Sequence, residues 1–561
     1  MGLSGFDIVV FVGYCALILG IGLWVSRDKE GHQKNAEDYF LASKSLPWWA
    51  IGASLIAANI SAEQFIGMSG SGFAIGLAIA SYEWMAAVTL LVVGKFFLPI
   101  FIKKGIYTIP EFVEKRFSTN LKTILAIFWI ALFVFVNLTT VLYLGARAMD
   151  TVIGTGDGSL MMYSILALGL FAAAYSLWGG LSAVAWTDVV QVVLLVIGGL
   201  ITTFITLEKV SPTGGIIDGF VHVFNTVPGK FSMILEKGEI ITPNGEDAWW
   251  SLPGLSVLVG GMWIANIYYW GFNQYIIQRT LAAKSLAESQ KGIVFAAALK
   301  MIIPIIVVVP GIIAFVMNAD ASGQLTTQTL DPSFVNKDGG IINDNAFPWL
   351  VRSFIPTGLK GLVLAALAAA IVSSLASMLN STSTIFTMDI FRPYINKNAS
   401  DKLTVNVGRI SGAVALVIAM IIAPMLGNLG QAFIFIQEYT GVVSPGILAV
   451  FLTGLFWKRA TNNAAIWGVI LSIPIALYFK VASNGWSDSG IFVNIPFMDQ
   501  MFITALLSIA IILLISYLEG KGKVNEKGIN LTAELFKTTP AFNIGATVIL
   551  IICAILYAIF W

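Results

Sequence analysis

Long apolar stretches alternate with short polar connections along almost the whole chain. A helix needs about 20 apolar residues to cross the hydrocarbon core of a bilayer. The pattern therefore predicts an all-α polytopic membrane protein with fourteen transmembrane helices. The predicted spans are residues 6–25, 47–76, 77–102, 123–150, 159–178, 184–207, 253–275, 287–318, 359–388, 405–426, 431–457, 461–480, 497–518 and 541–561.

One predicted span contains a polar interruption. The string Ala57–Gln64 lies inside span 47–76 and carries four polar side chains just before Gly67. Hydrocarbon offers polar groups no hydrogen-bond partners, so such a segment is tolerated only where it lines a protein cavity. Its core recurs as Ala265-Asn266-Ile267 in span 253–275. Matching interruptions in two halves of a bundle point to the binding site of a transporter.

A polar stripe runs along span 359–388. Ser373, Ser377, Asn380 and Thr384 follow helical spacing and share one face. Small and hydroxyl residues often serve only to pack membrane helices together, and we interpret the alanines of this span in that way. The continuity of the stripe favours a water-accessible or ion-lined pathway.

The same span also offers oxygen ligands. Ala370, Ser373 and Ser374 lie at positions i, i+3 and i+4, so a carbonyl and two hydroxyls can face the carbonyls released near Ala57 and Ile60. A shell of oxygens without a carboxylate suits a hard monovalent cation such as Na⁺, and interrupted helices supply such carbonyls in transporters. A proton would more naturally use a buried carboxylate or histidine.

Burying a charged side chain within a membrane span costs free energy, so a charge that is present there indicates a functional role. Glu83 and Lys300 are the deepest, and the alternative for them is a purely structural ion pair. Asp188 begins span 184–207. A role in cation exit and a plain charge near a helix start explain Asp188 equally well.

Amides and aromatic rings gather around these charges. Asn266, Tyr269 and Asn273 share one helical face, and Gln437 interrupts span 431–457. Amides, a carboxylate and a lysine beside aromatic rings describe a site for a neutral polyhydroxylated ligand, whose ring stacks while its hydroxyls bond. A site for an amino acid would need dedicated charge partners, and Glu83 and Lys300 could also serve as these.

The composition and the missing motifs exclude several classes of protein. The 561 residues are 57% hydrophobic and only 11% charged, about half the charged share of a soluble domain. The net charge of +1 provides no basic surface for nucleic acid. The sequence has neither a phosphate-binding G-x-x-x-x-G-K-[ST] loop nor the H-E-x-x-H and G-x-S-x-G motifs of hydrolases. We therefore expect neither an enzyme nor an organic cofactor.

The basic residues predict the orientation. Most of the 32 lysines and arginines, Arg279 among them, fall in alternate connections beginning with the one after span 6–25. The positive-inside rule assigns these connections to the cytoplasm and both termini to the outside. The apolar segment near the N-terminus lacks a basic region before it, so we interpret it as a retained span rather than a signal peptide.

Four segments together resemble the sodium:solute symporter family, and within it the bacterial sodium/galactose, or sodium/glucose cotransporter-type, branch. They are Ile56–Gly67, Gly179–Ala183 with Trp186-Thr187-Asp188, Tyr268–Trp270 and Ala370–Ser374. The resemblance covers nearly the whole chain, and it implies a LeuT-like core of two inverted five-helix repeats. The implied divisions are an extra N-terminal helix and loop in 1–46, the repeats in 47–207 and 253–457, an outer loop in 208–252 and three peripheral helices in 458–561.

The resemblance also implies roles for individual residues. Substrate-binding positions match Gln64, Glu83, Asn266, Lys300 and Gln437. Gate positions match Asn59 and Tyr269 on the inside and Met68, Tyr82 and Phe433 on the outside. The Na⁺ site matches backbone oxygens of Ala57, Ile60 and Ala370 with the hydroxyls of Ser373 and Ser374, and Asp188 matches a residue linked to sodium exit. Ala86 and Phe133 depart from the galactose-carrier pattern, which has serine and tyrosine there, so the preferred hexose stays open.

The implied function is Na⁺-coupled symport of a hexose, galactose and/or glucose, into the cell by alternating access. The alternative is a Na⁺ symporter of the same architecture for another small solute, such as an amino acid, a carboxylate or sialic acid. A sodium channel and a membrane sensor are weaker alternatives. We expect Na⁺ as the co-transported ion, a sugar and the lipid bilayer as partners, no nucleic acid, and a monomer or weak homodimer in the bacterial inner membrane.

Overall fold

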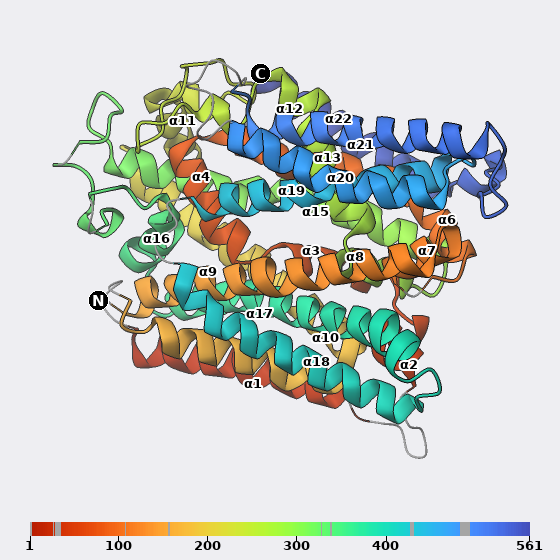
Figure 1. The fold of residues 1–561 in the computed structure, drawn as a ribbon. Coiled ribbons are helices and arrows are strands. Elements are labelled where there is room, and N and C mark those ends of the chain that lie inside the picture. The colour runs from red at the N-terminus through yellow and green to blue at the C-terminus, as the bar shows by residue number, and fades with distance from the viewer. Residues whose placement is uncertain are drawn as a thin grey trace.

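The helices run side by side in one bundle (Figure 1). The computed structural model describes residues 3–25, 27, 35–106, 108–154, 158–326, 328–336, 339–426, 431–482 and 494–561. Over these ranges the chain is helical, and extended pairing is limited to isolated bridges. The predicted all-α fold class is confirmed.

The first half of the bundle contains α1 (Gly5–Val25), α2 (Ala36–Leu41), α3 (Trp48–Asn59), α4 (Ser69–Ala74), α5 (Ser81–Val92), α6 (Leu98–Lys103), α7 (Ile109–Arg116), α8 (Thr119–Ala131), α9 (Thr139–Ile153), α10 (Met161–Val210) and α11 (Ile216–Thr226). The second half contains α12 (Leu255–Val259), α13 (Gly261–Ile267), α14 (Gln274–Leu281), α15 (Leu286–Asn318), α16 (Ala346–Phe354), α17 (Leu359–Ile385), α18 (Asp401–Ile422), α19 (Ala432–Phe456), α20 (Asn462–Val481), α21 (Phe497–Gly520) and α22 (Pro540–Ile559). Wider π-helical turns are inserted at η2 (Glu63–Met68), η4 (Val93–Phe97), η5 (Leu132–Leu138), η8 (Tyr268–Phe272) and η11 (Phe386–Ile395).

Eleven helical segments among the described residues are long and apolar enough to cross a membrane, and the bent pair Ala248–Val259 and Gly261–Phe272 could form a twelfth. The predicted number of fourteen is therefore not reached by uninterrupted helices. Predicted span 47–76 is divided into α3, η2 and α4, and predicted span 159–178 contains only the shorter apolar helix Met161–Ala174.

Helix α10 is broken inside its length at Gly180. This residue has a φ of +65°, and a Cβ there would lie 2.4 Å from the backbone oxygen of Tyr39. Both the left-handed backbone and the close approach require glycine. The two predicted spans 159–178 and 184–207 are thus joined through one strained residue.

The beginning of α1 and the end of α22 lie at the same end of the bundle as two long connections, residues 211–254 between α10 and α12 and residues 319–358 between α15 and α17. Near the N-terminus, Asp7 Oδ1 accepts from Gly358 N at 2.9 Å and Gly361 N at 2.7 Å. Near the C-terminus, Met233 N donates to Phe560 O at 2.7 Å. The loops meet where Asn244 Nδ2 donates to Ile341 O at 3.0 Å.

The helical interruptions lie close to the predicted ones. Helix α3 ends at Asn59, and Ile60 is extended with ψ at 102°. The second broken segment was predicted over Trp263–Gln274, and the break lies inside it at Asn273, which is extended with ψ at 120°, whereas Ala265-Asn266-Ile267 are helical in α13. The Asn266 amide donates to Met262 O at 3.2 Å, one helical turn back, so this polar side chain needs no open backbone.

Helix α17 is buried along almost its whole length and packs against α10. Part of its polar stripe is satisfied within the helix, because Ser377 donates to Ser373 O and Thr384 to Asn380 O, both at 2.7 Å. Bonds of this kind satisfy a hydroxyl within its own helix, so these two side chains can serve helix packing alone. The hydroxyls of Ser373 and Ser374 donate to groups on other helices, as described below.

Candidate functional site

A cavity lies between the two interrupted spans and helices α5, α15 and α19. It encloses about 540 Å³ of empty space, its open mouth included. All five predicted substrate-binding residues line it, namely Gln64 on η2, Glu83 on α5, Asn266 on α13, Lys300 on α15 and Gln437 on α19. Residues up to 373 positions apart in the sequence are thus brought to one place by the fold.

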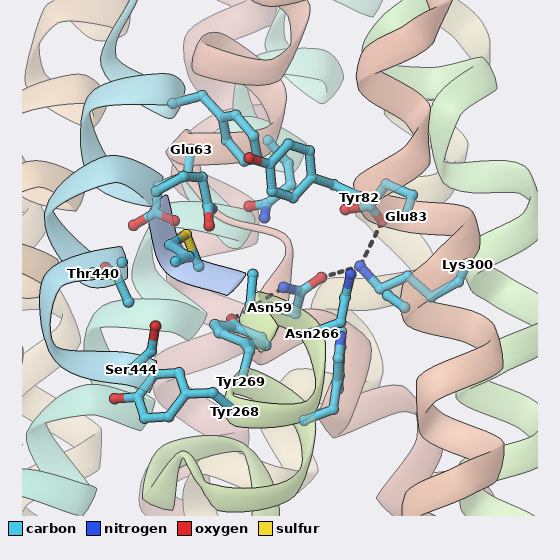
Figure 2. Close-up of a pocket in the computed structure, with 18 residues that line it drawn as sticks. Asn59, Glu63, Tyr82, Glu83, Asn266, Tyr268, Tyr269, Lys300, Thr440 and Ser444 are labelled. Carbon is cyan, nitrogen blue, oxygen red and sulfur yellow. Dashed lines mark hydrogen bonds and ion pairs between the residues drawn. The ribbon is translucent and has the colours of Figure 1, made fainter. Parts of the chain in front are cut away.

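Glu83 and Lys300 form an ion pair in the wall of this cavity (Figure 2). The Nζ–Oε2 distance is 2.5 Å, and the Lys300 and Glu83 side chains are only 1% and 3% exposed. Lys300 Nζ also donates to Asn59 Oδ1 and lies 5.0 Å from the centre of the Trp270 ring. A buried pair needs such additional partners, because desolvation of two charges costs several kcal/mol per ion.

Asn59 also contacts the predicted inner gate. Its Nδ2 donates to Tyr269 Oη at 3.0 Å, and Tyr275 Oη donates to the same oxygen at 2.6 Å. Tyr269 is therefore held between an amide on α3 and a second tyrosine on α14. The predicted pairing of Asn59 with Tyr269 is present in this structure.

Two of the three predicted outer-gate residues meet directly. The rings of Tyr82 and Phe433 are perpendicular, with centroids 4.9 Å apart, and both line the cavity. Met68 is fully buried on η2 and is not among the cavity-lining residues. Its neighbour Gly67 packs on the backbone of Phe433, where a Cβ would lie 3.1 Å from the nitrogen. This close approach lets η2 and α19 pack without a gap.

The predicted sodium ligands converge at the end of α3. Ser61 N would bond Ala57 O in a continuous helix, but it bonds Gln64 Oε1 at 2.9 Å instead. Ala57 thereby loses the donor that a helix supplies. From α17, Ser374 Oγ donates to Ala58 O at 2.9 Å. The structure thus brings the Ser374 hydroxyl of α17 against the last turn of the interrupted helix α3.

Asp188 lies beside these ligands, fully buried on α10. Its carboxylate accepts from Ser373 and Ser54, both at 2.5 Å. Arg279 Nη2 lies 3.5 Å from Asp188, and Arg279 Nε donates to Ser54 at 2.7 Å. Arg279 was expected in a cytoplasmic connection, where a basic side chain usually faces water, but its guanidinium is fully buried in the protein. Only one observation in the sequence pointed to a buried Arg279: a carboxylate at Asp188 within a span needs a positively charged partner.

A continuous series of contacts joins the cavity to Asp188. It passes from Lys300 to Asn59, Tyr269 and Tyr275, whose backbone oxygen accepts from Arg279 Nη1. Of the two departures from the galactose-carrier pattern, Ala86 lines the cavity. Phe133 packs edge-on against Tyr275, with ring centroids 5.5 Å apart, and is not among the residues that line the cavity.

The cavity also contains residues that sequence reasoning missed. Thr440 and Ser444 follow Gln437 by three and seven positions on α19, so helical spacing could have identified them. Glu63 is the neighbour of Gln64 in the polar string. Helical periodicity gave no signal for Glu63, because it lies on a π-helical turn directly after the interruption.

Comparison with known proteins gives the family. The family model described as Sodium:solute symporter family matches residues 39–472. The chain belongs to the sodium:solute symporter family. This symporter is 58% identical over 560 residues to the sodium/glucose cotransporter of Vibrio parahaemolyticus, covering 100% of this chain and 99% of that protein. It is 33% identical over 475 residues to the bovine sodium/myo-inositol cotransporter 2, covering 84% and 69% of the two chains.

The fold of the symporter is shared with a solved structure. A Na⁺-coupled sialic acid symporter in a substrate-bound outward-open state superposes with a TM-score of 0.75 at 24% identity. The match covers 92% of this chain and 98% of that one. The family and these relatives are described as transporters rather than enzymes, so the protein is a sodium-coupled transporter with many membrane spans.

Proposed function

We propose that this symporter imports a hexose, galactose and/or glucose, together with Na⁺ by alternating access. The observation that carries the proposal is the cavity that gathers Gln64, Glu83, Asn266, Lys300 and Gln437 around a buried ion pair. The side chain of Gln437 and the Nε2 of Gln64 have no hydrogen-bond partner among the described residues, so they are free to bond sugar hydroxyls. The name of the Vibrio relative supports a hexose.

The cycle follows from the contacts of the two gates. Na⁺ bound by Ala57, Ile60, Ala370, Ser373 and Ser374 stiffens the interrupted helix and so positions Gln64 for the sugar. Closure of Tyr82 and Phe433, with Met68 behind them, occludes the cavity. Loss of the Asn59–Tyr269 bond opens the inner gate, and Asp188 assists the departure of Na⁺.

The sodium gradient is sufficient for this task. One charge moving through 100 mV gains about 2.3 kcal/mol. A tenfold Na⁺ gradient adds about 1.4 kcal/mol. Their total, about 3.7 kcal/mol, sustains a sugar gradient of a few hundredfold for one ion per sugar.

We propose fourteen crossings in a bacterial inner membrane, with both termini periplasmic. The eleven long helices, the bent pair, the interrupted span of α3 and α4 and the short helix Met161–Ala174 supply that number, which is even as the termini require. The proposed divisions are 1–46, the repeats 47–207 and 253–457 with loop 208–252 between them, and 458–561. A monomer or weak homodimer suffices, because all the proposed site residues come from one chain.

The test of the function is uptake into proteoliposomes under an imposed Na⁺ gradient. We expect labelled galactose or glucose to accumulate only when Na⁺ is outside. Competition by amino acids, carboxylates and sialic acid tests the alternative of another small solute. Accumulation of a non-sugar solute, with no sugar uptake, would refute the hexose.

Gln437→Ala is expected to raise the apparent KM for the sugar about fivefold, because the loss of one neutral hydrogen bond costs about 1 kcal/mol. The maximal rate at saturating sugar should change little. The measurement is initial uptake against sugar concentration at fixed Na⁺. An unchanged KM would remove Gln437 from the site.

Ser374→Ala is expected to raise the half-saturating Na⁺ concentration at least tenfold, since one oxygen of the proposed shell is lost. The control is Ser377→Ala, whose hydroxyl bonds within its own helix and to Arg279 rather than to α3. The measurement is initial sugar uptake against Na⁺ concentration. Equal Na⁺ dependence in the Ser374 variant and the wild type would contradict the assignment.

A further inference from the structure

The cavity has two polar walls, and only one of them is internally paired. Figure 2 shows Glu83, Lys300 and Asn266 on one side and Glu63 with Thr440 and Ser444 on the other. On the first wall the Glu83–Lys300–Asn59 contacts consume most of the polar groups. On the second wall, Glu63 Oε1 and Ser444 Oγ are buried and have no hydrogen-bond partner among the described residues.

Glu63 is a carboxylate without a protein partner. The residue is 6% exposed, and Ser444 is fully buried. No lysine or arginine in the described part of the chain forms an ion pair with Glu63. Buried polar atoms are almost always hydrogen-bonded, so each exception needs an explanation. Because both atoms line the same cavity, what the cavity holds is the explanation that serves both.

The backbone holds Glu63 in place. Glu63 N donates to Ser61 Oγ at 3.0 Å, and the side chain leaves the π-helical turn next to Gln64. Ser444 lies two helical turns from Gln437 on the same face of α19. Glu63 and Ser444 therefore flank the two proposed sugar-binding amides, on the wall opposite the ion pair.

We propose that Glu63 and Ser444 form a second substrate contact, which receives the sugar hydroxyls farthest from the Glu83–Lys300 pair and thereby selects among hexose epimers. The inference rests on the proposed function. A carboxylate accepts hydrogen bonds from two neighbouring hydroxyls, and the Ser444 hydroxyl donates or accepts. A hexose presents hydroxyls around its whole edge, so two opposed polar walls hold it at both ends while aromatic rings cover its faces.

Epimer selection follows from the cost of an unpaired group. When a sugar presents an epimeric hydroxyl or a hydrogen at this wall, the Glu63 carboxylate stays buried without a donor. A site built to bond a hydroxyl rejects an analogue that lacks it for this reason. Removing the carboxylate removes the penalty, so the variant should discriminate less while still transporting sugar.

The test is a competition panel in proteoliposomes containing the full chain. Inhibition constants of glucose, galactose, mannose and the singly deoxygenated glucoses are measured against labelled sugar for the wild type, Glu63→Gln and Ser444→Ala. We expect at least one deoxy or epimeric analogue to bind at least tenfold less well than its parent to the wild type. In both variants the ratio of the analogue's inhibition constant to that of its parent sugar should fall at least fivefold. The half-saturating Na⁺ concentration should stay unchanged.

The matched control is Glu438→Gln. Glu438 lies on α19, the helix of Ser444, but it pairs with Lys480 and is not among the residues that line this cavity. Glu63→Asp, which retains the charge but shortens the side chain, is the second variant if Glu63→Gln does not fold. Equal ratios in variants and wild type would overturn the inference while sugar uptake by the wild type upholds the proposed function. A changed Na⁺ coefficient in Glu63→Gln would overturn it in favour of a cation site. Absence of any hexose uptake by the wild type would refute both.

Discussion

Lys300→Met is expected to abolish sugar uptake and to destabilise the folded symporter. The substitution leaves the Glu83 carboxylate buried without its counter-charge and removes the donor to Asn59 Oδ1. Removing one partner of a buried ion pair costs about 3–5 kcal/mol. Part of that cost falls on folding and part on sugar binding, so uptake below KM should fall at least a hundredfold, or about 2.7 kcal/mol.

Two measurements separate folding from transport. Thermal unfolding of the purified protein in detergent gives the stability loss, and proteoliposome uptake gives the transport loss. The control is Lys291→Met on the same helix, because Lys291 forms only an exposed pair with Glu288; its effect should be within about 1 kcal/mol. The double variant Glu83→Gln with Lys300→Met should regain stability but not uptake. Uptake within threefold of the wild type in the single variant would remove Lys300 from the site.

Arg279→Met is expected to slow transport at least tenfold without weakening sodium binding. The guanidinium neutralises Asp188 and also bonds Ser54, Ser377 and the backbone of Tyr275. Without it, a buried carboxylate remains beside the proposed sodium ligand Ser373 and competes for the ion. Na⁺ should then be held more tightly and released more slowly, the opposite of the result expected for Ser374→Ala.

The readouts are the half-saturating Na⁺ concentration and the turnover rate at saturating Na⁺ and sugar. A purely structural role would lower the amount of folded protein without changing the sodium dependence per folded molecule. The control is Lys284→Met, an exposed residue shortly after the same helix. Weaker sodium binding in Arg279→Met, comparable to that of Ser374→Ala, would contradict the competition by Asp188.

Hydropathy predicted most of the fold, and the failures have physical causes. A window of apolar residues does not distinguish a straight helix from one divided at Ile60 or broken at Gly180, so hydropathy alone does not predict which of the fourteen spans are continuous helices. Within the second broken segment, Asn266 did not locate the break, because its side chain looks equally polar in the sequence whether it caps an open backbone or bonds one turn back within a helix.

Some residues of the candidate site could be predicted from the sequence, and others could not. Glu83 and Lys300 could be identified because each is a charge inside an apolar span, where few explanations exist. Arg279 could not, because it lies where a connection is expected, and basic residues there normally face water. Glu63 was overlooked since a carboxylate at a helical interruption has no distinctive spacing. The contacts between helices that are distant in the sequence could not be predicted from the sequence.

The π-helical turns have a consequence for how the gates move. Gln64 and Met68 lie on η2, and Tyr269 lies on η8. Such a turn contains one more residue than an α-helical turn requires, and neighbouring helical residues differ by about 100° in direction. If the extra residue passes to an adjoining segment, a side chain rotates by about that angle while the helix keeps its hydrogen bonds. A π-helical turn at each proposed gate would thus let Met68 or Tyr269 turn toward or away from the cavity without unwinding of the helix.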